Sequence, residues 1–265
     1  MSRYLDFKNA KNTLSTIDLN KKDYLLIHYS CESFYDKKDG YSPRITSIAI
    51  RKVDNGQTDL FAIHKIAEIK HITFNEISNH YDELEKEMLH TFFQFVSINK
   101  EKNWIHWNMR DTNYGFKALE HRARVLGIEP SKISDDHKID LALLLMQRYG
   151  SQYEPNPRMQ NLIEKNNIRP KDFLNGKDEA TAFDNQDYIR LGMSAASKVD
   201  AFSSILNLSF DNKLLVDTKK LDIYGMSIRG FLAMVEDSPT LRIIKYILNL
   251  IIGGIVGAII TLIIK

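Results

Sequence analysis

The sequence of 265 residues is poor in cysteine and has almost no net charge, and each shortage excludes a class of protein. Its one cysteine, Cys31, excludes a disulfide framework and a cysteine-based zinc site within the chain, which suits a reducing compartment. A formal net charge of +2 gives no global basic field, so nucleic-acid binding would need a local basic patch. The eight histidines have no HxH or HExxH spacing, so a histidine metal site has little support. Residues 1–20 contain no apolar stretch of the kind found in signal peptides.

What the sequence does have is a charge-free apolar run from Tyr246 to Ile264. A helix over this run would be about 29 Å long, close to the hydrocarbon thickness of a bilayer. Arg242 and Lys245 precede the run, and positive charge favours the cytoplasmic side of a membrane. We therefore expect a tail-anchored, single-pass membrane protein. Residues 241–265 would be a C-terminal transmembrane helix in the lipid bilayer, with the N-terminal domain in the cytoplasm.

Two further patterns concern the membrane. Gly253 and Gly257 have the GxxxG spacing that lets two membrane helices approach closely, so a homodimer through this helix face is one expected assembly. The connector before the anchor mixes apolar residues such as Ile228 and Phe231 with basic residues such as Arg229. Such a segment either lies along a membrane surface or packs back onto the domain.

Upstream of the anchor, apolar spacing predicts three antiparallel strands and then alternating helices and strands. The expected strands are 24–29, 44–53, 57–64, 104–107 and 137–140, and the expected helices are 81–98, 114–126, 141–149, 159–165 and 178–208, with Gly192 as a candidate break. This order favours an α/β fold with a mixed sheet and helices on its faces, which is the ribonuclease H-like arrangement. The expected division is an N-terminal lead (1–21), a ribonuclease H-like domain (22–208), a juxtamembrane connector (209–240) and the anchor (241–265).

Three short motifs stand where this arrangement would bring them together. The first strand ends in Ser30-Cys31-Glu32, Asp111 follows His106 by five residues after the fourth strand, and Asp200 lies on the last long helix. In order and spacing these motifs resemble those of the DEDD family of 3′–5′ exonucleases, a branch of the ribonuclease H-like superfamily. The resemblance implies a residual acidic trio of Glu32, Asp111 and Asp200 as catalytic residues, which would hold a single Mg²⁺ or Mn²⁺ ion.

The chain departs from the family pattern at two points that matter for catalysis. Ser30 stands where the family has its first aspartate, and a hydroxyl cannot replace that charge. Ala195 and Ala196 stand where the family has a histidine or tyrosine, and neither can accept a proton. We therefore expect a degenerate exonuclease-like domain, a pseudoenzyme rather than an enzyme.

Three functions follow from this interpretation. The leading hypothesis is binding of a nucleic-acid end, a nucleotide or a partner chain beside a membrane, which would suit a bacterial defence or stress response. The first alternative is an active metal-dependent 3′–5′ exonuclease with a non-standard site. The second alternative is an interaction scaffold that assembles through its membrane helix.

Basic residues recur around the helix that follows Asp111. Arg110, Lys117, His121 and Arg124 would form a nucleic-acid-binding stripe that follows the phosphate backbone, or else an ordinary solvated helix face. Nearby, Trp107 would either stack a base or pack in the core.

The first strand carries two more candidates for chemistry. His28 and Ser30 should face one way and Cys31 the other, because side chains alternate along a strand. A nucleophilic pair of Cys31 and His28 is therefore geometrically poor.

Overall fold

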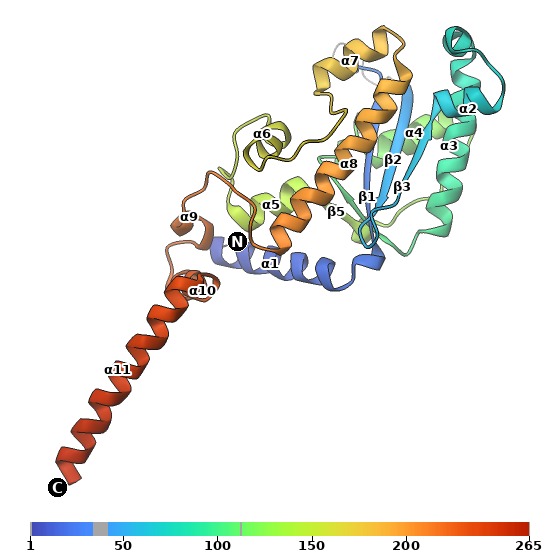
Figure 1. Cartoon of the computed structure of the whole chain (residues 1–265). Helices are drawn as coiled ribbons and strands as arrows, with labels where there is room; N and C mark the ends of the chain where they lie inside the picture. The colour runs from blue at the N-terminus through green and yellow to red at the C-terminus, as the bar shows by residue number, and fades with distance from the viewer. Residues whose placement is uncertain (1, 34–41, 112, 265) are drawn as a thin grey trace.

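The chain forms a five-stranded sheet with helices on both faces and a long C-terminal helix that projects away from it (Figure 1). The computed structural model describes residues 2–33, 42–111 and 113–264, and for Pro239, Ile255 and residues 257–264 it describes only the backbone. The strands are β1 (Tyr24–Cys31), β2 (Ile45–Lys52), β3 (Thr58–Ala62), β4 (Asn103–His106) and β5 (Lys138–Asp140). The helices of the domain are α1 (Arg3–Leu19), α2 (Ile63–Ile69), α3 (Tyr81–Ile98), α4 (Phe116–Val125), α5 (Leu141–Tyr149), α6 (Arg158–Lys165), α7 (Gly176–Asp184) and α8 (Tyr188–Phe210). The C-terminal region adds α9 (Lys220–Tyr224), α10 (Ile228–Asp237) and α11 (Pro239–Ile264).

The sheet is mixed, and its strand order is β3-β2-β1-β4-β5. β2 pairs antiparallel with both β1 and β3, whereas β1, β4 and β5 run parallel. The long crossovers that parallel strands require are supplied by the segment containing α2 and α3 and by the segment containing α4. The expected α/β class and mixed sheet are therefore confirmed.

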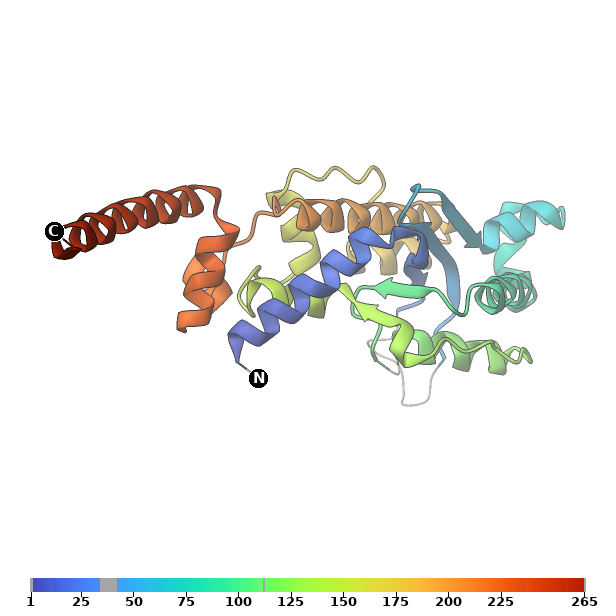
Figure 2. The same ribbon diagram turned by 90° about the horizontal axis from the view of Figure 1, so that it is seen from below.

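Each face of the sheet has its own core, and β1 contributes to both because its side chains alternate. Leu25 and Ile27 pack in the core that includes residues of α3 and α4. Leu26 packs in the other core, with residues of α1, α5 and α8. The two layers of helices are separated by the sheet in Figure 2. The long helix α8 crosses β1 and β2 on the second face and so carries its side chains over the end of β1.

Two of the differences from the expected elements concern α1 and the region of α7 and α8. Residues 3–19, expected only as a lead, form α1, which buries Phe7, Leu14 and Ile17 in the second core. The expected helix 178–208 is two helices: the chain turns after α7, where Gln186 has a φ of 59°, and α8 then continues through Gly192 without a break. This turn puts α7 beside α8 rather than in line with it, which proves decisive for the candidate site.

Helix α11 is 26 residues long, and its described side chains lie largely in the open. Its exposed apolar residues include Ile243, Ile247 and Ile251. Within the described part of the chain, no helix is apolar over a sufficient length to span a membrane. The expected transmembrane helix is therefore not supported by the described residues. Gly253 has open space around it, whereas the surroundings of Gly257 lie outside the described residues, so the expected dimer stays a prediction.

Candidate functional site

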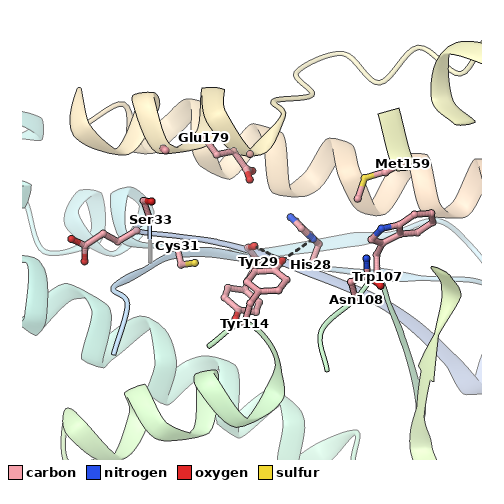
Figure 3. Close-up of a pocket in the computed structure, with 12 residues that line it drawn as sticks. His28, Tyr29, Cys31, Ser33, Trp107, Asn108, Tyr114, Met159 and Glu179 are labelled. Atoms are coloured by element: carbon pink, nitrogen blue, oxygen red, sulfur yellow. Dashed lines mark hydrogen bonds between the residues drawn. The ribbon is translucent and has the colours of Figure 1, made fainter. Parts of the chain in front are cut away.

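A cavity of about 300 Å³ opens at the carboxyl ends of β1 and β4, bounded also by α6 and α7. Ligands of open α/β sheets bind at this end of the strands. The lining residues are His28, Tyr29, Cys31, Glu32, Ser33, Trp107, Asn108, Tyr114, Met159, Gly176, Glu179 and Ala180. Trp107 and Met159 lie at one end of the cavity, and Cys31 and Ser33 lie at the other (Figure 3).

A buried ion pair between α7 and α8 forms one side of the site. Lys198 Nζ lies 2.7 Å from Glu179 Oε2. Glu179 Oε1 accepts hydrogen bonds from Ser30 Oγ at 2.9 Å and from Ser194 Oγ at 3.0 Å. Lys198 is only 5% exposed, and this burial lowers its pKa although Glu179 opposes the effect. Because three donors from β1 and α8 hold one carboxylate, Glu179 fixes α7 over the end of β1.

The start of α7 follows from local sequence. The side chain of Asn175 accepts hydrogen bonds from the backbone N–H groups of Lys177 and Asp178, both at 3.0 Å, which satisfies two donors of the first turn. Glu179 then stands at the end of that turn and faces Ser30 and Lys198.

His28 lies on the same face of β1 as Ser30, as strand alternation predicts, and it is 5% exposed. Its ring packs edge-on against Phe202 of α8, with 6.0 Å between centroids. Its Nδ1 lies 3.2 Å from the hydroxyl of Tyr114, whereas its Nε2 has no hydrogen-bond partner among the described residues. Burial, reinforced by the nearby charge of Lys198, holds the pKa of His28 well below its ordinary value, so the ring is neutral at neutral pH.

Tyr114 reaches β1 from the loop before α4. Its ring stacks on Tyr29 at 4.5 Å between centroids, and its hydroxyl donates to the Tyr29 carbonyl at 3.1 Å (Figure 3). The next residue, Gly115, donates its N–H to the Tyr29 hydroxyl at 2.8 Å. A Cβ on Gly115 would lie 2.5 Å from the Met109 carbonyl oxygen, so only glycine lets the loop approach this closely.

Cys31 is the one thiol of the cavity. Burial raises its pKa well above the ordinary value, and the carboxylate of Glu179 adds to this effect. The protonated thiol is a poor nucleophile.

The three carboxylates of the expected acidic trio are not brought together. Glu32 lines the cavity, but Asp111 lines a second cavity beside β5 and α5. Asp200 is exposed and pairs with Arg51 of β2 at 3.1 Å. In the ranges that the structure describes, no three histidine, cysteine or acidic side chains are grouped so as to hold a metal ion. The described residues therefore give the expected Mg²⁺ or Mn²⁺ ion no support, and its binding stays a prediction.

The second cavity, of about 340 Å³, is where some of the expected basic residues lie. Arg110 Nε is 2.6 Å from Asp140 Oδ2, so its charge is already neutralised. Lys117 lines this cavity and is exposed on α4. His121 and Arg124 are also exposed on α4, and Arg124 pairs with Glu120 at 3.4 Å. The basic stripe is therefore partly neutralised by neighbouring carboxylates.

Glu179, Lys198 and Tyr114 are among the residues of the site that the sequence interpretation missed. A helical-periodicity signal was available for Lys198, which falls in the same stripe as Leu191 and Val199, whereas Asp200 falls on the opposite side of the helix. Nothing in the local sequence of Glu179 indicates that it reaches β1, because its position depends on the turn between α7 and α8.

Comparisons of the chain with protein-family models, with curated proteins and with solved structures found no match. The exonuclease resemblance therefore rests on the order of elements and on the sequence motifs.

Proposed function

We propose that this protein is a non-catalytic relative of the DEDD exonucleases that binds a nucleotide or a nucleic-acid end in the cavity at the end of β1. The observation that carries the proposal is the ion pair of Glu179 and Lys198. It stands between β1 and the last helix of the domain, where the resemblance implies carboxylates around a metal. The ammonium of Lys198 repels a divalent cation, and neutral His28 and Ser30 supply no compensating negative charge. This chemistry favours binding over hydrolysis.

The cavity has features that suit a nucleotide. Its volume of about 300 Å³ is at the lower end of the range for small-molecule sites. Trp107 and Tyr114 provide aromatic surface in its wall, and every nucleobase has a face that can stack on such surface. The exposed charge of Lys117 on α4 could contact the phosphate backbone of a longer strand.

The test measures binding and degradation together. Full-length protein in lipid nanodiscs is titrated into fluorescently labelled single-stranded DNA and RNA, with and without Mg²⁺ or Mn²⁺. We expect saturable binding and intact oligonucleotides under all conditions. Lys117→Glu should weaken binding and reduce the salt dependence by about one counterion. Lys65→Glu, which changes an exposed lysine of α2 in the same way, should have no such effect.

Two results would contradict this proposal. Metal-dependent degradation that disappears in Asp111→Ala would establish the active exonuclease instead. Failure of every oligonucleotide and mononucleotide to bind would leave the interaction scaffold as the remaining hypothesis.

In this proposal α11 holds the module at a membrane with the domain in the cytoplasm. The support is the sequence, since the run beyond Val256 continues without a charge to Ile264. The neighbouring helix α10 adds exposed apolar side chains, with Ile228 82% and Phe231 56% exposed. Part of the connector packs back onto the domain, since Ile223 lies in the second core and Asp237 pairs with Lys11 of α1. The exposed apolar face of α10 suits a membrane surface, so each of the two expectations for the connector applies to part of it.

Cell fractionation tests the anchor. The full chain should remain with membranes after a high-salt wash, and a chain ending at residue 240 should not. Ile251→Arg should weaken retention, because an arginine at the centre of a membrane helix costs about 2.5–3.5 kcal/mol. Ile98→Arg, at another exposed position, on α3, serves as the control. If the truncated chain stays with membranes, the α9–α10 region makes the membrane contact. If the full chain is released by the wash, the proposed anchor is wrong.

A further inference from the structure

The carboxylate of Glu179 is surrounded by three hydrogen-bond donors, which come from Lys198, Ser30 and Ser194. We propose that these three donors form a phosphate-binding site, which Glu179 occupies in this structure, and that the phosphate of a nucleotide or of a nucleic-acid end displaces Glu179 from it. This inference rests on the proposed function and names the group of the ligand that the protein recognises.

The three donors are held in place by the domain rather than by Glu179. Lys198 Nζ lies 2.7 Å from Glu179 Oε2. The hydroxyls of Ser30 and Ser194 donate to Glu179 Oε1 at 2.9 and 3.0 Å. Ser194 Oγ also accepts from the N–H of Leu174 at 3.2 Å, which leaves its one proton for Glu179. Because β1 and α8 contribute to the cores of the domain, the donors stay together when Glu179 leaves.

Glu179 stands between these donors and the cavity at the end of β1. Glu179 lines the cavity, and its side chain is 15% exposed. The side chain of Lys198 is only 6% exposed, and Ser30 is 2% exposed. A ligand in the cavity therefore reaches Glu179 first, and rotation of the Glu179 side chain away from the donors would open them to that ligand.

A phosphate monoester matches the three donors better than the carboxylate does. It carries a charge of about −1.5 to −2 at neutral pH and has three strong acceptor oxygens, one for each donor. The carboxylate of Glu179 carries a single charge, and both serine hydroxyls share one of its two oxygens. Lysine is a common phosphate ligand, because its ammonium acts as a point charge. The arrangement therefore favours a terminal phosphate over the carboxylate that now fills the site.

Exchange of one anion for another costs little at this position. Desolvation of a buried ion pair offsets much of the attraction between its charges, and the ammonium of Lys198 keeps an anionic partner throughout the exchange. Within α7, all of whose residues are described, Ala182 is the one buried residue, so the position of α7 depends strongly on the polar contacts of Glu179. Displacement of Glu179 should therefore loosen α7.

Binding of adenosine monophosphate (AMP), adenosine and orthophosphate tests the site. Each is titrated by calorimetry into the full-length protein in phosphatidylcholine nanodiscs. We expect AMP to bind more tightly than adenosine. Glu179→Gln removes the competing carboxylate, so it should raise the affinity for AMP at least about tenfold without changing that for adenosine. Asp178→Asn removes the same charge from an exposed position of α7 and should leave both affinities unchanged.

A double variant locates the effect on Lys198. Glu32 also lines the cavity and disfavours an anion there, so phosphate binding depends on the charge of Lys198. Combining Lys198→Met with Glu179→Gln removes both charges of the pair and leaves neither one unpaired, and thermal melts confirm that this variant folds. Its preference for AMP over adenosine should be lost.

Hydrogen exchange of α7 is an independent readout in the wild type. AMP should speed the exchange of the α7 amides, because Glu179 no longer attaches this helix to β1 and α8. A ligand that only fills the cavity would slow their exchange, and this is what we expect of adenosine.

The outcomes separate this inference from the proposed function. If AMP and adenosine bind equally, or if Glu179→Gln does not strengthen AMP binding, the inference is wrong and the proposed function survives. A retained AMP preference in the double variant, or slower exchange of α7 with AMP, also overturns the inference. Binding of orthophosphate through Lys198 without binding of any nucleotide or oligonucleotide would support the phosphate site and overturn the proposed function. If none of these probes binds, both are wrong.

Discussion

Glu85 and Glu179 each pair with a cation away from bulk solvent, and the two pairs are built differently. Glu85 of α3 accepts from Arg122 of α4 through both oxygens, at 2.9 and 2.5 Å, and also from the N–H of Ile45 at 2.6 Å. Glu179 accepts from Lys198 through one oxygen and from two serine hydroxyls through the other. The planar guanidinium matches a carboxylate at two points, whereas an ammonium is a single point charge.

The surroundings of the two pairs show what this difference means. The side chain of Glu85 is fully buried, and its partners join α3, α4 and the start of β2. The side chain of Glu179 is 15% exposed, and Glu179 lines the cavity at the end of β1. The first pair therefore contributes only to the stability of the fold. The second pair also borders an open cavity, so in the proposed function its charge and geometry would act on binding.

The largest expected effect comes from breaking the first pair. Arg122→Met leaves the carboxylate of Glu85 buried without a counterion, and loss of one partner of a buried pair costs about 3–5 kcal/mol. Denaturant unfolding of the full-length protein in detergent, followed by circular dichroism, measures the loss. Adding Glu85→Gln to this variant should recover much of the stability, because it removes the uncompensated charge. A loss below about 1 kcal/mol would show that the pair does not fix the fold.

A smaller effect is expected at the second pair. Lys198→Met should cost about 1–3 kcal/mol, because Ser30 and Ser194 still bind Glu179 and the open cavity lets water reach its carboxylate. The same unfolding measurement applies, with Lys65→Met as the exposed control. If Lys198→Met costs as much as Arg122→Met, the cavity provides no solvation and the contrast between the two pairs is wrong.

Much of the fold could be predicted because its signals are local. Alternating apolar residues indicated β1 and β2, and helical spacing indicated α3, whose buried face includes Leu84, Met88 and Phe92. The same reasoning missed α1, whose core residues Phe7, Leu14 and Ile17 are separated by polar stretches. The turn between α7 and α8 was also missed, although Asp184, Asn185 and Asp187 around it are residues that turns and helix caps favour.

The site was harder to predict because chain order does not say which way a side chain points. Asp200 stands in a plausible place in the sequence, but helical periodicity turns it away from β1 and puts Lys198 there. His28 was correctly placed beside Ser30 by strand alternation. The partners of both residues, Glu179 and Tyr114, come from distant segments and could not be inferred without the tertiary fold.

The smallest expected effect is that acid changes the stability contributions of His28 and Glu85 in opposite directions. The folded-state pKa of His28 is well below the unfolded value of about 6.5, because burial and Lys198 disfavour its charge. The unfolded chain therefore binds a proton at His28 that the folded chain does not, and stability present above pH 6.5 is lost as the pH falls toward the folded-state pKa. Glu85 has the opposite sign, since burial raises its pKa and mild acid relieves the cost of its charge.

Unfolding free energies from pH 7 to pH 5 should separate these contributions. Relative to His28→Asn, the wild type should lose up to about 1.4 kcal/mol more for each pH unit below 6.5. His64 and His106 also have lowered pKa values, but they are present in both proteins and cancel in the difference. Equal slopes for the two proteins would mean that the folded state does not lower the pKa of His28.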